Sequence, residues 1–244
     1  MRLWNSSRRS QPAVWDVSCH KYAHRGLWRP EGPSENSIPS FAAARRWGFG
    51  VELDVTLSGD GEPVVFHDQD LKRMCGLETR LRDLDLKDLE RMRLPDGSTI
   101  PSLGRAICEL GETPTLIELK AHQDPEEIAW QVLRQLAGAQ GRFALMSFIP
   151  ETVRALVASG SDSPVGLLLD ASDEGNLSDV LDWALTRGCA FAGPNVTLLR
   201  RPEIGAFPLP CVVWTIRRRE DLPDRPGWAP IFEGLEPEEV SPSQ

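Results

Sequence analysis

The stretch VELDV, residues 51–55, places two acids inside an apolar, β-branched run that has the composition of a strand. Four more runs of this kind end in polar residues: KYAHR (21–25), PVVFHD (63–68), TLIELK (115–120) and CVVWT (211–215). A strand that ends in a charge is costly unless that end faces a solvated rim. Active sites of parallel α/β barrels are built at such a rim, from the C-terminal ends of several strands. The five clusters therefore favour one shared site.

Apolar runs recur along the chain and alternate with segments of helical spacing, which predicts right-handed βαβ units and a parallel sheet. The expected strands are residues 21–23, 51–57, 63–66, 115–119, 143–147, 165–169, 189–192 and 211–215. The expected helices are residues 36–47, 102–110, 125–136, 150–158, 177–187 and 196–204. Eight strands in 244 residues predict an α/β fold of the TIM (β/α)8 barrel type. An open doubly wound sheet is the alternative, although no G-x-G-x-x-G follows the first strand.

The connections on either side of residues 63–66 depart from a regular barrel. The linker SGDGE (58–62) is too short for a helical crossover, so either one helix is missing or the two strands are not parallel neighbours. The connection from residue 66 to residue 115 is much longer than a usual βα loop. We therefore expect a small insertion after the third strand, residues 68–100, which forms a subdomain or lid beside the site.

The remaining sequence predicts one barrel domain over residues 21–236, preceded by an N-terminal arm (1–20) and followed by a flexible tail (237–244). The formal net charge of −9 argues against a nonspecific binder of nucleic acid or of anionic membranes. No apolar run is long enough for a signal peptide or a transmembrane span. The five cysteines are scattered without a C-x-x-C motif, which favours a reducing compartment. We expect a cytoplasmic enzyme.

The two acids of VELDV, Glu52 and Asp54, lie two residues apart, so both side chains project from the same face of the strand. Two carboxylates on one face repel each other unless a cation, a proton or an arginine neutralises them. Glu118, at the end of another expected strand, offers a third carboxylate, and an all-oxygen site suits Mg²⁺ or Ca²⁺. The alternative is that the acids face solvent or pair with Arg25 and Lys120.

Two of the four histidines, His24 and His67, follow expected strands, and each is flanked by a charged residue. A lone histidine at a strand end is more often a core or surface residue, but two at one rim predict an acid/base pair. Arg25 and Lys120 offer fixed positive charge for a phosphate. Cations, a divalent ion and two imidazoles together suit phosphoryl transfer. The alternative reading of the two cations is a pair of ordinary salt bridges.

These motifs, in this order, resemble the glycerophosphodiester phosphodiesterase family of TIM-barrel enzymes. The likeness runs from about residue 22 to residue 216. The matching segments are AHRG (23–26), SENSIPSF (34–41), VELDV (51–55), VFHD (65–68), IPSL (100–103), IELK (117–120), SF (147–148) and VWTI (213–216).

The resemblance implies roles for eight residues of the five clusters. It implies that two histidines form an acid/base pair (His24, His67) and that three acids hold a divalent ion (Glu52, Asp54, Glu118). It also implies that Arg25 and Lys120 contact the phosphate and that Trp214 lines the glycerol side. From the residues alone, Trp214 either lines the pocket or packs in the barrel. Asn36 is implied to brace the loop around the metal ligands.

Three positions depart from the family pattern. Ser34 stands where the family usually has proline, Arg217 stands where asparagine is usual, and the segment 232–237 replaces the terminal T-D-x-P motif. The last two lie where the alcohol group would be recognised, so the identity of that alcohol stays open.

The function implied by the resemblance is metal-dependent hydrolysis of glycerophosphodiesters to sn-glycerol 3-phosphate and an alcohol, with His/His acid–base catalysis. One alternative is a phospholipase D-like or phosphoinositide-type phosphodiesterase acting on lipid head groups. Another is a noncatalytic phosphodiester-binding barrel, which the fold alone does not exclude. The expected partner is a small-molecule glycerophosphodiester, with no nucleic acid and no stable membrane insertion, and a homo-oligomer is left open.

Overall fold

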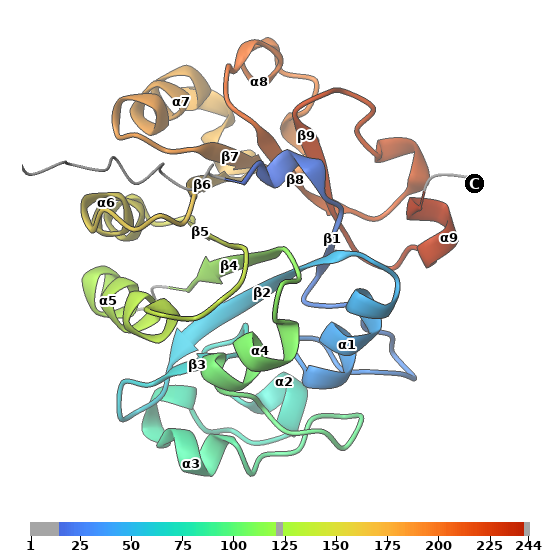
Figure 1. Ribbon diagram of the computed structural model, residues 1–244, viewed down its shortest axis with the longest axis vertical. Coiled ribbons are helices and arrows are strands. Elements are labelled where there is room, and N and C mark those ends of the chain that lie inside the picture. Colours follow the sequence, from blue (N-terminus) through green and yellow to red (C-terminus); the bar gives the residue numbers. More distant parts are fainter. Residues whose placement is uncertain (1–14, 121–123, 242–244) are drawn as a thin grey trace, which may run out of the picture.

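The computed structural model describes residues 15–120 and 124–241, so the expectations for residues 1–14 and 242–244 lie outside the described residues. Eight parallel strands form a closed barrel, in which the first strand pairs with both the second and the last (Figure 1). The order around the barrel is β1 (Tyr22–His24), β2 (Gly50–Leu57), β4 (Thr115–Leu119), β5 (Phe143–Ser147), β6 (Val165–Leu169), β7 (Phe191–Pro194), β8 (Cys211–Ile216) and β9 (Trp228–Phe232). The predicted TIM-type barrel is confirmed.

Helices cover the outside of the barrel (Figure 1). They are α1 (Ile38–Arg46), α4 (Leu103–Leu110), α5 (Pro125–Leu136), α6 (Pro150–Ala158), α7 (Leu177–Thr186) and α8 (Pro202–Ala206), with a short α9 (Pro237–Val240) after the last strand. The side chains of Ser37 and Asp124 cap the first turns of α1 and α5, and a proline opens α5, α6 and α8. The helix expected over residues 196–204 is instead a short 3₁₀ turn followed by α8.

One expected barrel strand is wrong, and one barrel strand was not expected. The strand at 63–66 is not a barrel member: β3 (Pro63–Val65) doubles back on β2 and pairs with it antiparallel, with Val65 opposite Val55. This confirms the alternative that the two strands are not parallel neighbours. The place of the eighth barrel strand is taken by β9, which the sequence analysis did not identify. Its sequence contains Pro230, and a proline inside a strand-like run argues against a central strand.

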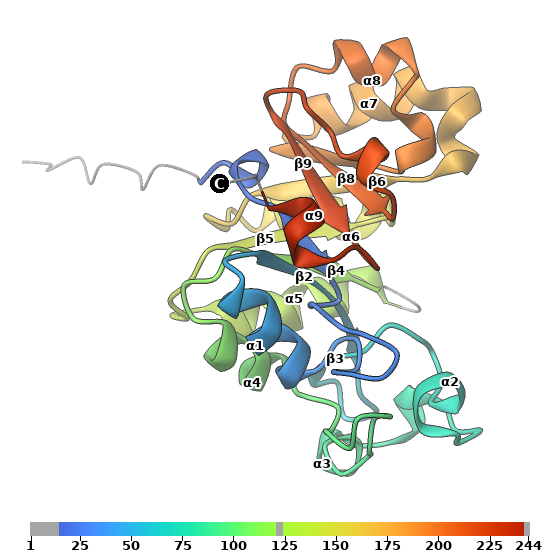
Figure 2. The ribbon, with the colours of Figure 1, turned by 90° about the vertical axis from the view of Figure 1, so that its right-hand side faces the viewer.

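The segment 68–100, called the insertion below, lies beside β3 at the end of the molecule opposite α7 and α8 (Figures 1 and 2). It contains the short helices α2 (Lys72–Cys75) and α3 (Leu86–Leu89). The insertion packs on β3 through a small apolar cluster of its own, separate from the barrel core. The buried members are Val64, Phe66, Leu71, Leu81, Leu89, Leu94 and Ile100.

The barrel interior is filled by a second apolar cluster that forms the floor beneath the C-terminal rim. Its largest members are Tyr22, Leu116, Met146, Leu168, Phe191 and Ile231. Gly166 faces this interior because the ring of Phe191 occupies the position that a side chain would take. Within the part of the chain that the structure describes, no helix combines the length and apolar composition needed to cross a membrane.

We predict that Gly166→Ala lowers the free energy of unfolding by roughly 1–3 kcal/mol, because an added Cβ overpacks the barrel interior. That atom would lie 2.3 Å from Cε2 of Phe191. The matched control is Gly175→Ala, whose Cβ would meet no atom within 4 Å and which should change stability by less than about 0.5 kcal/mol. Urea denaturation measures both variants, and equal effects would contradict this account of the packing.

Candidate active site

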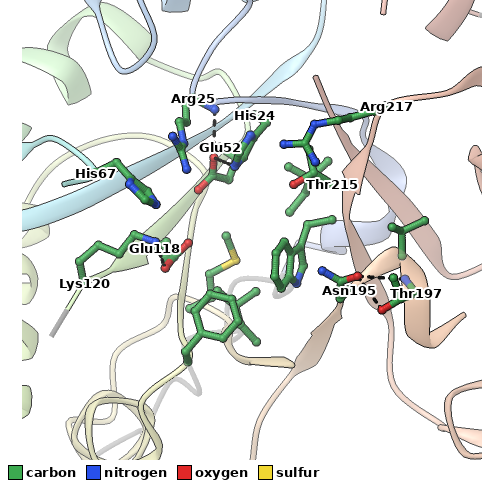
Figure 3. A pocket seen from close by; sticks show the side chains of 16 residues that line it. His24, Arg25, Glu52, His67, Glu118, Lys120, Asn195, Thr197, Thr215 and Arg217 are labelled. Carbon is green, nitrogen blue, oxygen red and sulfur yellow. Dashed lines mark hydrogen bonds and ion pairs between the residues drawn. The ribbon is translucent and has the colours of Figure 1, made fainter. Parts of the chain in front are cut away.

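The five polar clusters meet at the C-terminal rim of the barrel, around one cavity of about 470 Å³ (Figure 3). Seven of the eight residues singled out from the sequence line this cavity, and the eighth, Asp54, is fully buried next to them. The lining residues are His24, Arg25, Glu52, His67, Glu118, Lys120, Met146, Phe148, Leu168, Asn195, Val196, Thr197, Trp214, Thr215, Arg217 and Ile231.

The three acids form a compact, buried cluster. One oxygen from each of Glu52, Asp54 and Glu118 lies within 4.8 Å of the other two. Strand pairing explains this proximity: Asp54 on β2 stands opposite Glu118 on β4, and Glu52 stands opposite His24 on β1. Since residues two apart on a strand share a face, Glu52 and Asp54 both point inward from β2.

Two cations and an amide neutralise part of this cluster. Nε of Arg25 lies 3.1 Å from Oδ2 of Asp54, and the side-chain amide of Asn36 donates to the same oxygen at 2.8 Å. Nζ of Lys120 lies 3.2 Å from Oδ1 of Asp54 and 2.5 Å from Oε1 of Glu118. The cation pairing that the sequence left as an alternative is therefore present, in the same place as the acidic cluster.

Glu52 is the least neutralised of the three acids. Its Oε2 accepts a hydrogen bond from the backbone N–H of Arg25 at 3.0 Å, while Oε1 is buried without a hydrogen-bond partner among the described residues. The backbone of Arg25 is in the left-handed region, with φ of 57°, a conformation that a non-glycine residue adopts only where its surroundings hold it. Here the bond to Glu52 and a hydrogen bond from Oγ of Ser40 to the Arg25 carbonyl hold it.

The carboxyl pKa values follow from this arrangement. Burial, together with the charges of Asp54 and Glu118, raises the pKa of Glu52 well above its usual range. Burial also raises the pKa of Glu118 to about 7, although Lys120 opposes that shift. Burial acts in the same direction on Asp54, but the charges of Lys120 and Arg25 hold its pKa below the ordinary value. Three buried carboxyl groups, two of them with raised pKa values, form an all-oxygen cluster that suits a divalent cation.

His24, the last residue of β1, is oriented by an acid that the sequence analysis did not assign. Its Nδ1 lies 2.5 Å from Oε2 of Glu233, which follows β9, and Nη2 of Arg217 lies 3.2 Å from the same oxygen. Burial opposes ionisation of Glu233, but the bond to His24 keeps the pKa of that carboxyl below its usual value. The available signal was an acid directly after the run PIF, at the place where the family's T-D-x-P motif is missing.

His67 reaches the same rim through the hairpin between β2 and β3. Because β3 runs back along β2, the N–H of Phe66 donates to the carbonyl of Asp54 at 3.0 Å, and His67 comes level with the acids. Its Nδ1 lies 2.7 Å from Oδ1 of Asp68, whose other oxygen accepts from Nε of Arg73 at 2.7 Å. Burial lowers the pKa of His67, although the charge of Asp54 acts the other way. The neutral, proton-accepting ring is thereby favoured.

Trp214 belongs to the lining of the cavity, and Asn195 and Thr215 lie across the cavity from His67 and Lys120 (Figure 3). The indole N–H of Trp214 donates to the carbonyl of Gly193 at 2.7 Å, and its ring meets Phe148 edge-on with ring centres 5.2 Å apart. These two contacts fix the indole in place. Asn195 and Arg217 place polar groups on this side of the cavity.

Solved structures with this fold include two phosphodiesterases. The glycerophosphodiester phosphodiesterase from Thermotoga maritima matches with a TM-score of 0.71 at 26% identity, over 86% of this chain and 92% of that one. The phosphodiesterase from Oleispira antarctica, solved in complex with the product sn-glycerol-3-phosphate, matches with a TM-score of 0.71 at 22% identity, over 87% and 92% of the two chains. The second likeness, at this identity, supports the fold alone.

Curated relatives carry the same name. The probable glycerophosphodiester phosphodiesterase 2 of Mycobacterium tuberculosis is 34% identical over 100 residues, which cover 41% of this chain and 38% of that protein. Glycerophosphodiester phosphodiesterase 1 of Rattus norvegicus is 27% identical over 145 residues, which cover 54% of this chain and 43% of that protein. The matches therefore span less than half the length of either relative.

The model of the glycerophosphoryl diester phosphodiesterase family matches residues 24–222, a range that begins at the first catalytic candidate and includes all three acids and both histidines. The chain belongs to the glycerophosphoryl diester phosphodiesterase family.

Proposed function

We propose that this protein is a metal-dependent phosphodiesterase that hydrolyses glycerophosphodiesters to sn-glycerol 3-phosphate and an alcohol. The observation that carries the proposal is the convergence of three buried carboxylates and two carboxylate-held histidines on one cavity. Membership of the family supports the substrate class. The sn-glycerol-3-phosphate bound to the Oleispira antarctica enzyme supports the product.

The residues present fit a divalent ion, Mg²⁺ or Ca²⁺, held by Glu52, Asp54 and Glu118. The raised pKa values of Glu52 and Glu118 and the unpartnered Oε1 of Glu52 mark a cluster with too little positive charge. When bound, such an ion supplies Lewis-acid stabilisation of charge on the phosphate and lowers the pKa of a coordinated hydroxyl.

The side chains around this cluster bind the phosphate and move protons. Arg25 and Lys120 line the cavity and offer N–H donors to the nonbridging phosphate oxygens. In both histidines Nδ1 is engaged by a carboxylate, so Nε2 is the ring nitrogen that faces the reacting group. One imidazole accepts the proton of the attacking hydroxyl, and the other donates a proton to the leaving alkoxide.

The assay that tests this function couples release of glycerol 3-phosphate to a dehydrogenase, with glycerophosphocholine, glycerophosphoethanolamine and glycerophosphoglycerol as substrates. We expect turnover with Mg²⁺ or Ca²⁺, and its loss in excess EDTA, because the negative cluster would then lack its cation. Full activity in EDTA would remove the metal from the proposal. Turnover of lysophosphatidylcholine or a phosphoinositide alone would favour a lipid head-group enzyme, and binding without product release would favour a noncatalytic barrel.

His24→Ala and His67→Ala should each lower kcat by on the order of 10²-fold or more, because each removes one proton-transfer group. The matched control is His20→Ala. His20 contacts Arg142 at the opposite end of the barrel and should be dispensable for turnover. Steady-state kinetics measures kcat of each variant, and unchanged circular dichroism spectra show that each variant is folded. A wild-type kcat in His24→Ala or His67→Ala would exclude that histidine as an acid or base.

In the metal-free protein we expect stability to fall as the pH rises from about 5 to 8. Burial raises the pKa of Glu118 from 4.5 to about 7, so the folded state binds this proton more tightly than the unfolded state. This stabilisation is complete at pH values below 4.5, the pKa of Glu118 in the unfolded chain, and is lost as the pH rises through about 7, its pKa in the folded protein. Its size is on the order of 3 kcal/mol.

The melting temperature of EDTA-treated protein, recorded at several pH values across this range, measures the change in stability. Glu118→Gln, which carries a neutral amide at every pH, should make the dependence smaller, with the remainder due to Glu52. Added Mg²⁺ or Ca²⁺ should raise the stability of the wild type at pH 8 because the ion binds the folded state. An identical pH dependence in wild type and variant would contradict the buried charge at Glu118.

All five cysteines are free thiols. Free thiols support a reducing compartment, and we keep a cytoplasmic location as part of the proposal.

A further inference from the structure

We propose that Arg73 is a positioning residue of the active site, and that the insertion acts as a clamp on two site loops rather than as a lid. This inference rests on the proposed function. Arg73 lies on α2 and does not line the cavity, so any effect on turnover must pass through residues that do. Two of those residues, His67 and Arg25, come from separate loops of the barrel rim.

The guanidinium of Arg73 binds the carboxylates of both loops. Its Nε donates to Oδ2 of Asp68 at 2.7 Å, and Oδ1 of Asp68 lies 2.7 Å from Nδ1 of His67. Its two terminal nitrogens donate to the two oxygens of Glu35, at 2.9 and 2.6 Å. Oε1 of Glu35 also accepts from Nη1 of Arg25 at 2.9 Å. The planar guanidinium of Arg73 therefore holds both Asp68, which contacts His67, and Glu35, which contacts Arg25.

A second contact between the insertion and the same loop uses Ser34, the residue that departs from the family's usual proline. The N–H of Ser34 donates to Oδ2 of Asp96 at 2.9 Å, and the N–H of Asp96 donates to Oγ of Ser34 at 3.1 Å. The family's usual proline at position 34 has neither an N–H nor a hydroxyl, so it would make neither bond. Asn36, two residues on, holds Asp54 of the acidic cluster with its own backbone at φ of 52°.

The contacts of Arg73 serve the site loops more than the stability of the insertion. The insertion packs on β3 through its own apolar cluster, and no residue of α2 is buried. The Arg73 side chain is 46% exposed, whereas the Glu35 side chain that it binds is 8% exposed. Without Arg73, Glu35 keeps Arg25 as its cationic partner among the described residues, and Asp68 loses the contact that fixes its orientation toward His67.

The test compares Arg73→Ala and Arg73→Lys with the matched control Arg91→Ala in the coupled assay. Arg91 lies in the same insertion; its side chain is 77% exposed, and its guanidinium lies 3.4 Å from Oδ1 of Asp88. We expect Arg73→Ala to lower kcat by roughly 10- to 100-fold, because small misplacements of catalytic groups cost this much. Its melting temperature should fall no further than that of Arg91→Ala. Lysine should rescue little, since one ammonium cannot bridge two carboxylates.

Two further readouts separate positioning from folding. Because Arg73 is half-exposed, added guanidinium ion at tens of millimolar should restore activity to Arg73→Ala but not to His67→Ala. Imidazole ¹⁵N spectra should show His67 with its proton fixed on Nδ1 in the wild type and a mixture of both tautomers in Arg73→Ala.

Wild-type kcat in Arg73→Ala, or a loss that guanidinium does not restore while His67 keeps one tautomer, would overturn the inference. A wild-type protein that hydrolyses no diester would overturn the proposed function instead. The ¹⁵N spectra would still decide whether Arg73 positions His67.

Discussion

Three carboxylates that share a few ångströms of buried space repel one another, and this repulsion governs the construction of the rim. Arg25 and Lys120 contact different carboxylate oxygens of Asp54, and Asn36 adds a hydrogen bond. To supply these groups, the chain holds both Arg25 and Asn36 in left-handed backbone conformations. The loop that joins β1 to α1 is therefore shaped by the charge on β2, and strand pairing holds the acids of β2 beside β1 and β4.

The two histidines are supported by a common device, although they come from different parts of the barrel. In each, Nδ1 meets a carboxylate, and that carboxylate meets an arginine. The two chains of contacts are His24–Glu233–Arg217 and His67–Asp68–Arg73. Arg217 stands where the family usually has asparagine, and in this protein it contacts the acid behind His24. From the sequence, Arg217 was linked only to recognition of the alcohol group; in the structure it also contacts the carboxylate that orients His24.

Much of the fold and the acidic cluster could be predicted because both follow local rules. Alternation of strands and helices indicated a parallel barrel, and the C-terminal ends of parallel strands must share one rim. The supports of the site could not be predicted this way. Arg73 and Glu35 lie 38 positions apart in the sequence, and their pairing leaves no periodic pattern. The strand containing Pro230 was hidden by a residue that normally disfavours strands. His67 was expected at the rim because its strand was counted among the eight of the barrel, although a non-parallel arrangement was left open, and an antiparallel return brings it there.

The antiparallel pairing of β2 and β3 makes the position of His67 depend on the number of residues in the hairpin between them. The turn over residues 58–62 is closed by Ser58 and Glu62, which exchange backbone and side-chain hydrogen bonds. The register of β3 on β2 then fixes the position of His67, two residues after the end of β3. Since side chains alternate along a strand, gaining or losing one residue between Leu57 and His67 would turn the imidazole to the opposite face. The length of this hairpin is therefore part of what places His67 at the site.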